Sequence, residues 1–276
     1  MKKFFWLALA LALALPCSAK DKNTRKIITE NPSPLASSEE TDLPYEIPHV
    51  PWTNERLEFV VRWGLVSVGD AELHVRKIVK TSSGTVCYNM VSTAQSKPFF
   101  DAFYKVRDRN ESWMDAAKLR SAGYSRNIRE GGYRLQDWVV FDYDSNKFHA
   151  SELERDSDEI KTKDGDIPGP VQDMLSCLYY TRTQPLEVGK EIVFDVNTTK
   201  NWPLAVKVLE KETVSVPAGE FECFVVEPLM RDKGLFVQKG RSMKVWLTAD
   251  ERRIPVMMKA EVAVGHITAK LERIVR

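Results

Sequence analysis

The sequence predicts a mostly β protein, built on a large curved antiparallel sheet with one or two helices. From Trp52 onward, apolar and polar residues alternate with a period of two, which places apolar side chains on one face of each strand. Short turns join about a dozen such segments, and strands connected in this way pair antiparallel. Residues 138–141 and 221–226 are apolar on both strand faces, which indicates a curved sheet that wraps a helix or lines a cavity.

The first strand covers residues 57–63, where Leu57, Phe59 and Val61 share one face. Residues 64–70 are expected to form a short hairpin connection, and residues 155–170 a polar loop. The remaining strands are expected at residues 71–76, 85–94, 104–114, 119–129, 133–143, 147–153, 191–197, 204–214, 220–228, 241–248, 255–263 and 266–274.

Two stretches break the period of two and predict helices. In the first, four apolar residues are spaced at i, i+3, i+4 and i+7, which is one face of a helix: Val171, Met174, Leu175 and Leu178. Prolines 168 and 170 precede this stretch and proline 185 follows it, as expected at helix boundaries. In the second stretch, aromatic residues at positions 99, 100 and 103 follow a proline and predict a shorter helical turn.

Residues 1–19 are typical of a secretory signal peptide. Two lysines precede an uncharged apolar run from Phe4 to Leu15, which is too short to span a bilayer as a helix. Small residues before the Ala19–Lys20 bond predict cleavage there, and hence export to the periplasm with no transmembrane segment in the mature chain. An uncleaved anchor and lipidation at Cys17 are the less favoured alternatives.

Residues 20–51 differ in composition from the rest of the chain. They contain five of the fourteen prolines and few apolar residues, which predicts a flexible proline-rich linker. The alternative, applying to residues 45–52, is a segment that docks along the edge of the domain. Residues 52–276 are then expected to form a single antiparallel β domain.

Composition and motifs exclude several classes of function. The balance of 40 basic and 39 acidic residues argues against a nucleic-acid-binding protein. The sequence contains no GxSxG, Walker, GxGxxG or HExxH motif, so we expect no catalytic residues, no cofactor and an absence of enzymatic activity. The three cysteines of the mature chain lack CxxC spacing, so no zinc or other metal site is expected, and buried apolar roles are favoured for all three.

Two polar clusters have alternative interpretations. Arg107, Asp108 and Arg109 could present an inward charge to a ligand headgroup, but an Arg–Asp pair that braces the sheet is favoured. Asp173 and Ser176 could be read as an acid and a nucleophile. Because no histidine is placed by the sequence to activate the serine, a helix cap or a contact between helix and sheet is favoured.

Several phrases occur in an order that resembles one bacterial family. They are Glu55-Arg56-Leu57, Val171-Gln172-Asp173, Val216-Pro217-Ala218-Gly219, Val245-Trp246-Leu247-Thr248 and Arg253-Ile254-Pro255-Val256. Over residues 52–274 the chain is similar to the exported family called domain of unknown function 3108. The resemblance implies no assigned enzymatic activity, and no catalytic residue can be carried over. It also implies a fold similar to the periplasmic lipoprotein carriers LolA and LolB, an unclosed antiparallel β-barrel with helices in its mouth.

Three functions remain open at this point. The favoured one is binding or carrying a lipid, a lipoprotein acyl chain or another hydrophobic ligand during envelope biogenesis, because apolar lining alone can supply affinity. The second is a structural protein with a dry core that contacts another envelope protein. The third is an enzyme acting on envelope polymers through His74 or His149 and nearby carboxylates. The expected ligand-binding residues are Trp63, Phe99, Phe100, Phe103, Arg107, Met174, Leu175, Leu178 and Trp246.

Overall fold

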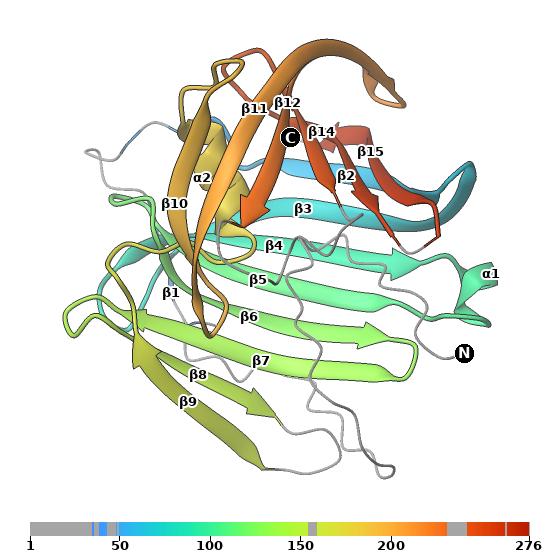
Figure 1. Cartoon of the computed structure of the whole chain (residues 1–276). Coiled ribbons are helices and arrows are strands. Elements are labelled where there is room, and N and C mark those ends of the chain that lie inside the picture. The colour runs from blue at the N-terminus through green and yellow to red at the C-terminus, as the bar shows by residue number, and fades with distance from the viewer. Residues whose placement is uncertain are drawn as a thin grey trace.

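The computed structural model describes residue 35, residues 39–42, residue 48 and residues 50–153, 159–230, 242–262 and 264–275. These residues form one 15-stranded antiparallel sheet with two helices (Figure 1). The predicted mostly β class and the curved, unclosed sheet are confirmed. The predicted signal peptide, residues 1–19, lies outside the described residues.

Strand neighbours in the sheet follow the sequence almost throughout. The order is β10-β11-β12-β13-β14-β15-β2-β3-β4-β5-β6-β7-β8-β9, and the short β1 pairs with β3 off this path. The strands are β1 Glu39–Glu40, β2 Arg56–Trp63, β3 Val66–Lys80, β4 Val86–Ser96, β5 Arg107–Asp115, β6 Ser121–Glu130, β7 Tyr133–Asp142, β8 Lys147–Leu153, β9 Ile160–Asp166, β10 Glu191–Asn197, β11 Asn201–Val216, β12 Gly219–Met230, β13 Met243–Thr248, β14 Pro255–Glu261 and β15 His266–Val275. The helices are α1 Pro98–Asp101 and α2 Ser176–Thr183.

The sheet curls around a common core. Buried residues of β2–β5 and of β11–β15 belong to one hydrophobic cluster together with α2, so these two walls face each other. Hydrogen bonds between the described parts of the edge strands β9 and β10 do not close the barrel. Instead, Gln172 pairs in parallel with Val196 of β10, and Asn201 donates a hydrogen bond to the Asp166 carbonyl at 2.7 Å. The curled sheet therefore stays an unclosed barrel, with α2 between its walls.

Two predicted elements differ in the structure. Residues 160–166 form β9, an edge strand, where a polar loop was predicted. Its sequence lacks the apolar alternation that marks a half-buried strand, its residues are mostly exposed, and its strand pairing is with β8. Helix α2 begins only at Ser176, because Gln172 forms a bridge with Val196 of β10 and residues 174–175 form a turn. Their apolar side chains are buried nonetheless.

Part of the predicted linker contacts the convex side of the sheet. Leu35 is buried and belongs to a small cluster with Val79, Cys87 and Trp113. Strand β1 pairs with the end of β3. At these residues the chain docks on the sheet, which differs from a free tether, because Val79, Cys87 and Trp113 form an apolar patch on the outer face that Leu35 covers.

Candidate functional site

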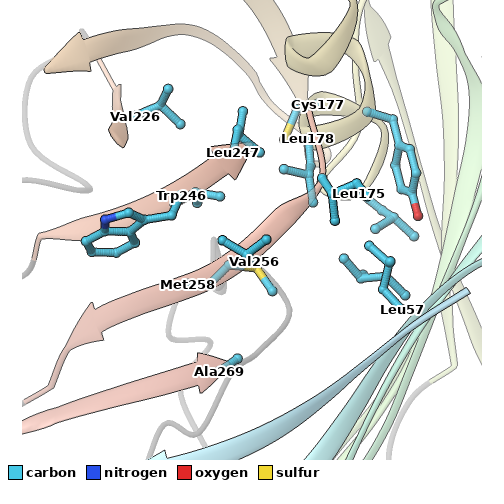
Figure 2. Close-up of a cluster of buried hydrophobic side chains, with 14 of the residues drawn as sticks. Leu57, Leu175, Cys177, Leu178, Val226, Trp246, Leu247, Val256, Met258 and Ala269 are labelled. Carbon is cyan, nitrogen blue, oxygen red and sulfur yellow. The ribbon is translucent and has the colours of Figure 1, made fainter. Parts of the chain in front are cut away.

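The concave face of the sheet contains an apolar region that α2 covers. It is formed by buried side chains of β2–β4 and β11–β15, together with Leu175 and Leu178 at α2. Figure 2 shows Leu247, Val256 and Met258 of β13 and β14 close to the helix residues. Leu57, Leu247 and Leu271 have exposures of 0%, which means that this region is densely filled by the protein's own side chains.

A buried ion pair fixes α2 to both walls. The Arg182 guanidinium donates two parallel hydrogen bonds to the Glu55 carboxylate, at 2.6 and 2.8 Å, and a third at 3.0 Å to the Arg252 carbonyl. The Arg182 side chain is fully buried and lies 5.4 Å from the Trp52 ring centroid. Because a buried charge without a partner is costly, this geometry ties the helix to the start of β2 and to the β13–β14 turn.

Asp173 joins the start of α2 to the sheet. Its Oδ1 accepts hydrogen bonds from the backbone N–H groups of Leu175 and Ser176, at 2.8 and 3.0 Å. Its Oδ2 accepts hydrogen bonds from the hydroxyls of Ser112 and Ser121, at 2.6 and 2.5 Å. The predicted cap and helix-to-sheet contact are both present, and they occupy both carboxylate oxygens.

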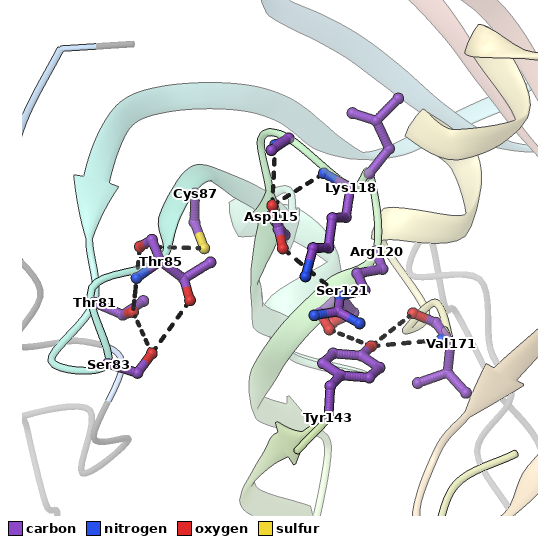
Figure 3. A network of polar contacts seen from close by, with 12 residues as sticks. Thr81, Ser83, Thr85, Cys87, Asp115, Lys118, Arg120, Ser121, Tyr143 and Val171 are labelled. Atoms are coloured by element: carbon purple, nitrogen blue, oxygen red, sulfur yellow. Dashed lines mark hydrogen bonds and ion pairs between the residues drawn. The ribbon is translucent and has the colours of Figure 1, made fainter. Parts of the chain in front are cut away.

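A second polar network lies near Asp173, at the end of the curved sheet where α2 begins (Figure 3). We call the space between the walls of the sheet the trough. The Tyr143 hydroxyl donates a hydrogen bond to the Ser121 carbonyl at 2.6 Å, and the Arg120 guanidinium lies 3.5 Å from the centroid of the Tyr143 ring. Asp115 accepts hydrogen bonds from the backbone N–H groups of Ala117 and Lys118 and thereby orders the β5–β6 turn. The Ser121 N–H donates a hydrogen bond to the Val171 carbonyl at 3.0 Å, which holds the segment before α2 against β6.

Beyond β4 the concave face is polar in part, because buried polar side chains of β5–β7 lie beside a separate apolar cluster that includes Tyr124, Val139 and Phe141. One row of directly paired residues runs across neighbouring strands. It begins with Leu57 of β2, which pairs with Leu73 of β3. The row then continues through Ser92 of β4, Asn110 of β5, Arg126 of β6 and Asp137 of β7. The Arg126 Nε atom donates a hydrogen bond to Asp137 at 2.9 Å, and the same two side chains form a second, shorter contact. A single row thus passes from two leucines to a buried ion pair.

Two buried carboxyl groups lie on this polar region, closer to the other end of the trough. Asp108 of β5 and Glu130 of β6 are each 5% exposed, and Asp108 accepts a hydrogen bond from the Arg129 backbone N–H at 2.9 Å. Burial, followed by the nearby Asp108 carboxyl, raises the pKa of Glu130 to about 8. Burial likewise raises the pKa of Asp108. The pair therefore holds a proton near neutral pH.

The nine residues predicted to bind ligand fall into two groups. Met174, Leu175, Leu178 and Trp246 are buried in the main core. The Trp246 indole donates a hydrogen bond to Glu212, and its ring extends away from α2 in Figure 2. The other five lie at the end of the trough opposite α2: Trp63, Phe99, Phe100, Phe103 and Arg107. Arg107 pairs with Asp101 of α1 at 2.6 Å and Arg109 with Glu111 at 2.9 Å, so neither arginine pairs with Asp108 as the favoured interpretation of this cluster expected.

The polar row was not among the predicted site residues. In β5 and β6 polar residues occupy both strand faces, so alternation gives no sign of which side chains point inward. Asn110, Arg126 and Asp137 become neighbours only through the pairing of three strands. The sequence suggested an apolar concave side. The structure shows instead that part of this side is polar. Its polar region lies where the apolar pattern of β5 and β6 is weakest.

Other chemistry that the sequence left open is placed as follows. His149 contacts Asp164 at 2.9 Å on the exposed surface, and His74 lies 3.5 Å from Glu72 on the outer face of β3. Cys87, Cys177 and Cys223 are buried and free, and burial raises the pKa of Cys87 and of Cys223 to about 12. Within the described ranges, His, Cys, Asp and Glu side chains form no group of three or more that could hold a metal ion.

Comparison with solved structures supports the β-barrel-like architecture. The chain is similar to a β-barrel-like protein of the domain of unknown function DUF1849 from Brucella abortus, with a TM-score of 0.52, 9% identity, and coverage of 80% of this chain and 96% of that one. It also matches an exported protein with a YmcC-like fold from Bacteroides fragilis, at 12% identity, a TM-score of 0.30, and coverage of 81% and 96%. A lipoprotein from Parabacteroides distasonis matches at 11% identity, a TM-score of 0.30, and coverage of 82% and 97%.

The structure with a TM-score of 0.52 is described as β-barrel-like, without mention of LolA or LolB, and at 9% identity this similarity shows the fold alone. Curated proteins give no match to this sequence. None of the helices in the described part of the chain combines the length and apolar character needed to cross a membrane. The family described as protein of unknown function (DUF3108) matches residues 58–272, and the chain belongs to this family.

Proposed function

We propose that this protein is an exported, non-catalytic component of the cell envelope that binds a lipid or another amphipathic ligand between the walls of its sheet. The observation that carries the proposal is the divided concave face. The row from Leu57 and Leu73 to Arg126 and Asp137 places an apolar surface beside a polar one. An amphipathic ligand has the same division, with its acyl chain suited to the first region and its headgroup to the second.

Binding would require the interior side chains to repack around the ligand. Four buried methionines face this region, and methionine adapts to irregular spaces because its side chain is unbranched and polarisable: Met90, Met114, Met174 and Met258. Burial of a 14-carbon chain could contribute about 11 kcal/mol before binding costs are subtracted, at about 0.8 kcal/mol per CH₂. Apolar contact alone could therefore hold such a ligand. The predicted signal peptide would deliver the protein to the periplasm.

The first test is native mass spectrometry of the protein purified from its own envelope, followed by titration of delipidated protein with a fluorescent fatty acid. We expect a co-purifying lipid and saturable uptake. Met258→Ala should strengthen uptake because it opens space beside α2, while Val193→Ala on the exposed face of β10 serves as the matched control. Absence of uptake by the monomer, with no difference between the two variants, would count against a ligand in the interior.

A second candidate, a structural or interaction protein with a filled core, is favoured by the burial itself. Trp52, Tyr179 and Leu247 are among the large side chains that are less than 2% exposed. If these residues only stabilise the fold, Met258→Ala should reduce stability without creating a site for fatty acids. The two candidates therefore differ in the response of the same variant.

A further inference from the structure

Exposed apolar side chains gather at the end of the trough opposite α2. Eight large hydrophobic side chains are exposed in the described part of the chain, and five of them lie on three turns at this end. We call these five residues the apolar rim: Leu65 (89% exposed), Val66 (53%), Phe99 (72%), Phe103 (77%) and Val264 (54%). Such a cluster on a protein surface commonly marks a contact with a partner or a membrane.

Hydrogen bonds join the three turns into one surface. The Gly64 N–H donates to the His266 carbonyl at 3.2 Å, and the Trp63 indole donates to the Val264 carbonyl at 2.9 Å, so the β2–β3 and β14–β15 turns are adjacent. The Lys97 N–H donates to the Val68 carbonyl at 2.9 Å, which places α1 beside β3. Figure 1 shows α1 and both turns at the same end of the sheet.

The aromatic tip is held in its exposed position by ordered contacts. The Phe99 ring packs edge-on against Phe100, with centroids 5.1 Å apart, and lies 5.8 Å from Phe103. In the same helix, both carboxylate oxygens of Asp101 accept hydrogen bonds from the Arg107 guanidinium, at 3.1 and 2.6 Å. Two phenylalanine side chains therefore remain exposed to solvent in the folded protein, although burial of each would be favourable by about 1.5 to 3 kcal/mol.

The chain segments that form and adjoin the apolar rim contain more basic than acidic residues. Residues 62–67, 96–107 and 261–266 contain its turns, and the β6–β7 turn at residues 129–134 adjoins them, because the Gly131 N–H donates to the Lys105 carbonyl at 2.8 Å. These four segments contain six basic and three acidic side chains, a net charge of +3 with histidine neutral. The chain as a whole carries +1. The basic side chains are Arg62, Lys97, Lys105, Arg107, Arg129 and Arg134.

We propose that the apolar rim docks on the surface of an anionic lipid bilayer. Aromatic and aliphatic side chains at the tips of the turns would enter the boundary between headgroups and acyl chains, and the basic residues behind them would meet the anionic headgroups. The net positive charge favours this occupant over an apolar protein partner or a second copy of the chain, for which like charges would oppose each other. The inference concerns where the protein attaches, and so goes beyond binding of a ligand in the interior.

The test is cosedimentation of the full chain, expressed with its own leader, with two kinds of vesicle. One kind is phosphatidylcholine alone, and the other has one part in three replaced by phosphatidylglycerol. We expect binding to the anionic vesicles that weakens with added salt. The double variant Phe99→Ser/Phe103→Ser should lower the partition constant at least about tenfold, since each ring loses its burial in the membrane. Lys97→Glu/Lys105→Glu should lower binding to the anionic vesicles.

The matched control is Val188→Ser/Val193→Ser, which removes two exposed apolar side chains outside the rim, before and within β10. All variants share one N-terminus, so any contribution of the leader cancels. Equal vesicle binding by the rim variant and the control would overturn the proposal, provided that thermal unfolding shows both to be folded. Self-association that the rim substitutions abolish, without vesicle binding by the wild type, would also overturn it and assign the rim to a second copy.

Fatty-acid uptake by delipidated protein is measured without vesicles. A negative uptake experiment would therefore count against the interior site and leave the vesicle-binding result unaffected.

Discussion

The apolar and polar regions of the concave face are built from the same sheet but stabilised in different ways. In the apolar region, around α2, side chains such as Leu57 and Leu247 are completely buried and contribute by excluding water. In the polar region, on β5–β7, Arg126 and Asp137 are buried as an ion pair, and burial raises the pKa values of the neighbouring carboxyls Asp108 and Glu130. The stability of the first region should fall when a buried side chain is shortened. The stability of the second should fall when a charged partner is removed, and it should depend on pH.

The largest expected effect comes from the ion pair that anchors α2 in the apolar region. Arg182→Met should lower the free energy of unfolding by about 3 to 5 kcal/mol, because the Glu55 carboxylate stays buried without its bidentate partner. Urea unfolding followed by tryptophan fluorescence would measure it. The double variant Glu55→Leu/Arg182→Met should regain much of the loss, since neither charge then remains buried. A single variant within 1 kcal/mol of the wild type would contradict the anchoring role.

Removal of volume from the apolar region should come next. Leu247→Ala is expected to cost about 2 to 5 kcal/mol, because the Leu247 side chain is fully buried on β13 facing a packed core. The exposed Val193→Ala provides the comparison and should stay within about 0.5 kcal/mol of the wild type. If both variants unfolded at the same urea concentration, the apolar region would not be the rigid part of the molecule.

Loss of one partner in the polar region should have a smaller effect. Asp137→Asn keeps the shape of the side chain but leaves the Arg126 guanidinium without a charged partner, at an expected cost of about 1 to 3 kcal/mol. The Arg126 side chain is 15% exposed, so water can compensate in part. Chemical denaturation of Asp137→Asn and of Arg126→Met/Asp137→Leu would separate the cost of an unpaired charge from that of the pair. If the double variant had a much lower free energy of unfolding than Asp137→Asn, the unpaired charge would not explain the loss of stability.

Glu130 should make the stability of the wild type fall as pH rises. Burial and Asp108 raise its pKa to about 8 in the folded state, so from about pH 4.5 to 8 the folded protein holds a proton that the unfolded chain has lost. Its stabilising contribution is complete below the unfolded pKa and disappears as pH passes the folded pKa, with a slope of at most about 1.4 kcal/mol per pH unit. Unfolding curves of Glu130→Gln at several pH values should be flatter over this interval. Parallel pH profiles for wild type and variant would exclude the effect.

The sequence by itself determined the features that repeat locally. Alternation in segments such as residues 57–63 defined most strands, because half-buried strands need apolar residues at every second position. The order of phrases around Val216–Gly219 and Val245–Thr248 also pointed to the family that matches residues 58–272. The two structural roles favoured for Asp173, a helix cap or a contact between helix and sheet, both occur, and the first follows from its position three residues before Ser176.

Only the tertiary structure decided which polar residues meet. Arg126 and Asp137 are eleven positions apart, and the pairing of β6 with β7 sets them opposite each other. Edge strand β9 also depended on its partner, since its polar residues carry no apolar signal of their own. The apolar rim has the same origin, because three turns far apart in the sequence come together only when the sheet pairs β15 with β2 and β3 with β4. Local patterns report burial along one strand, whereas a shared surface depends on register between strands.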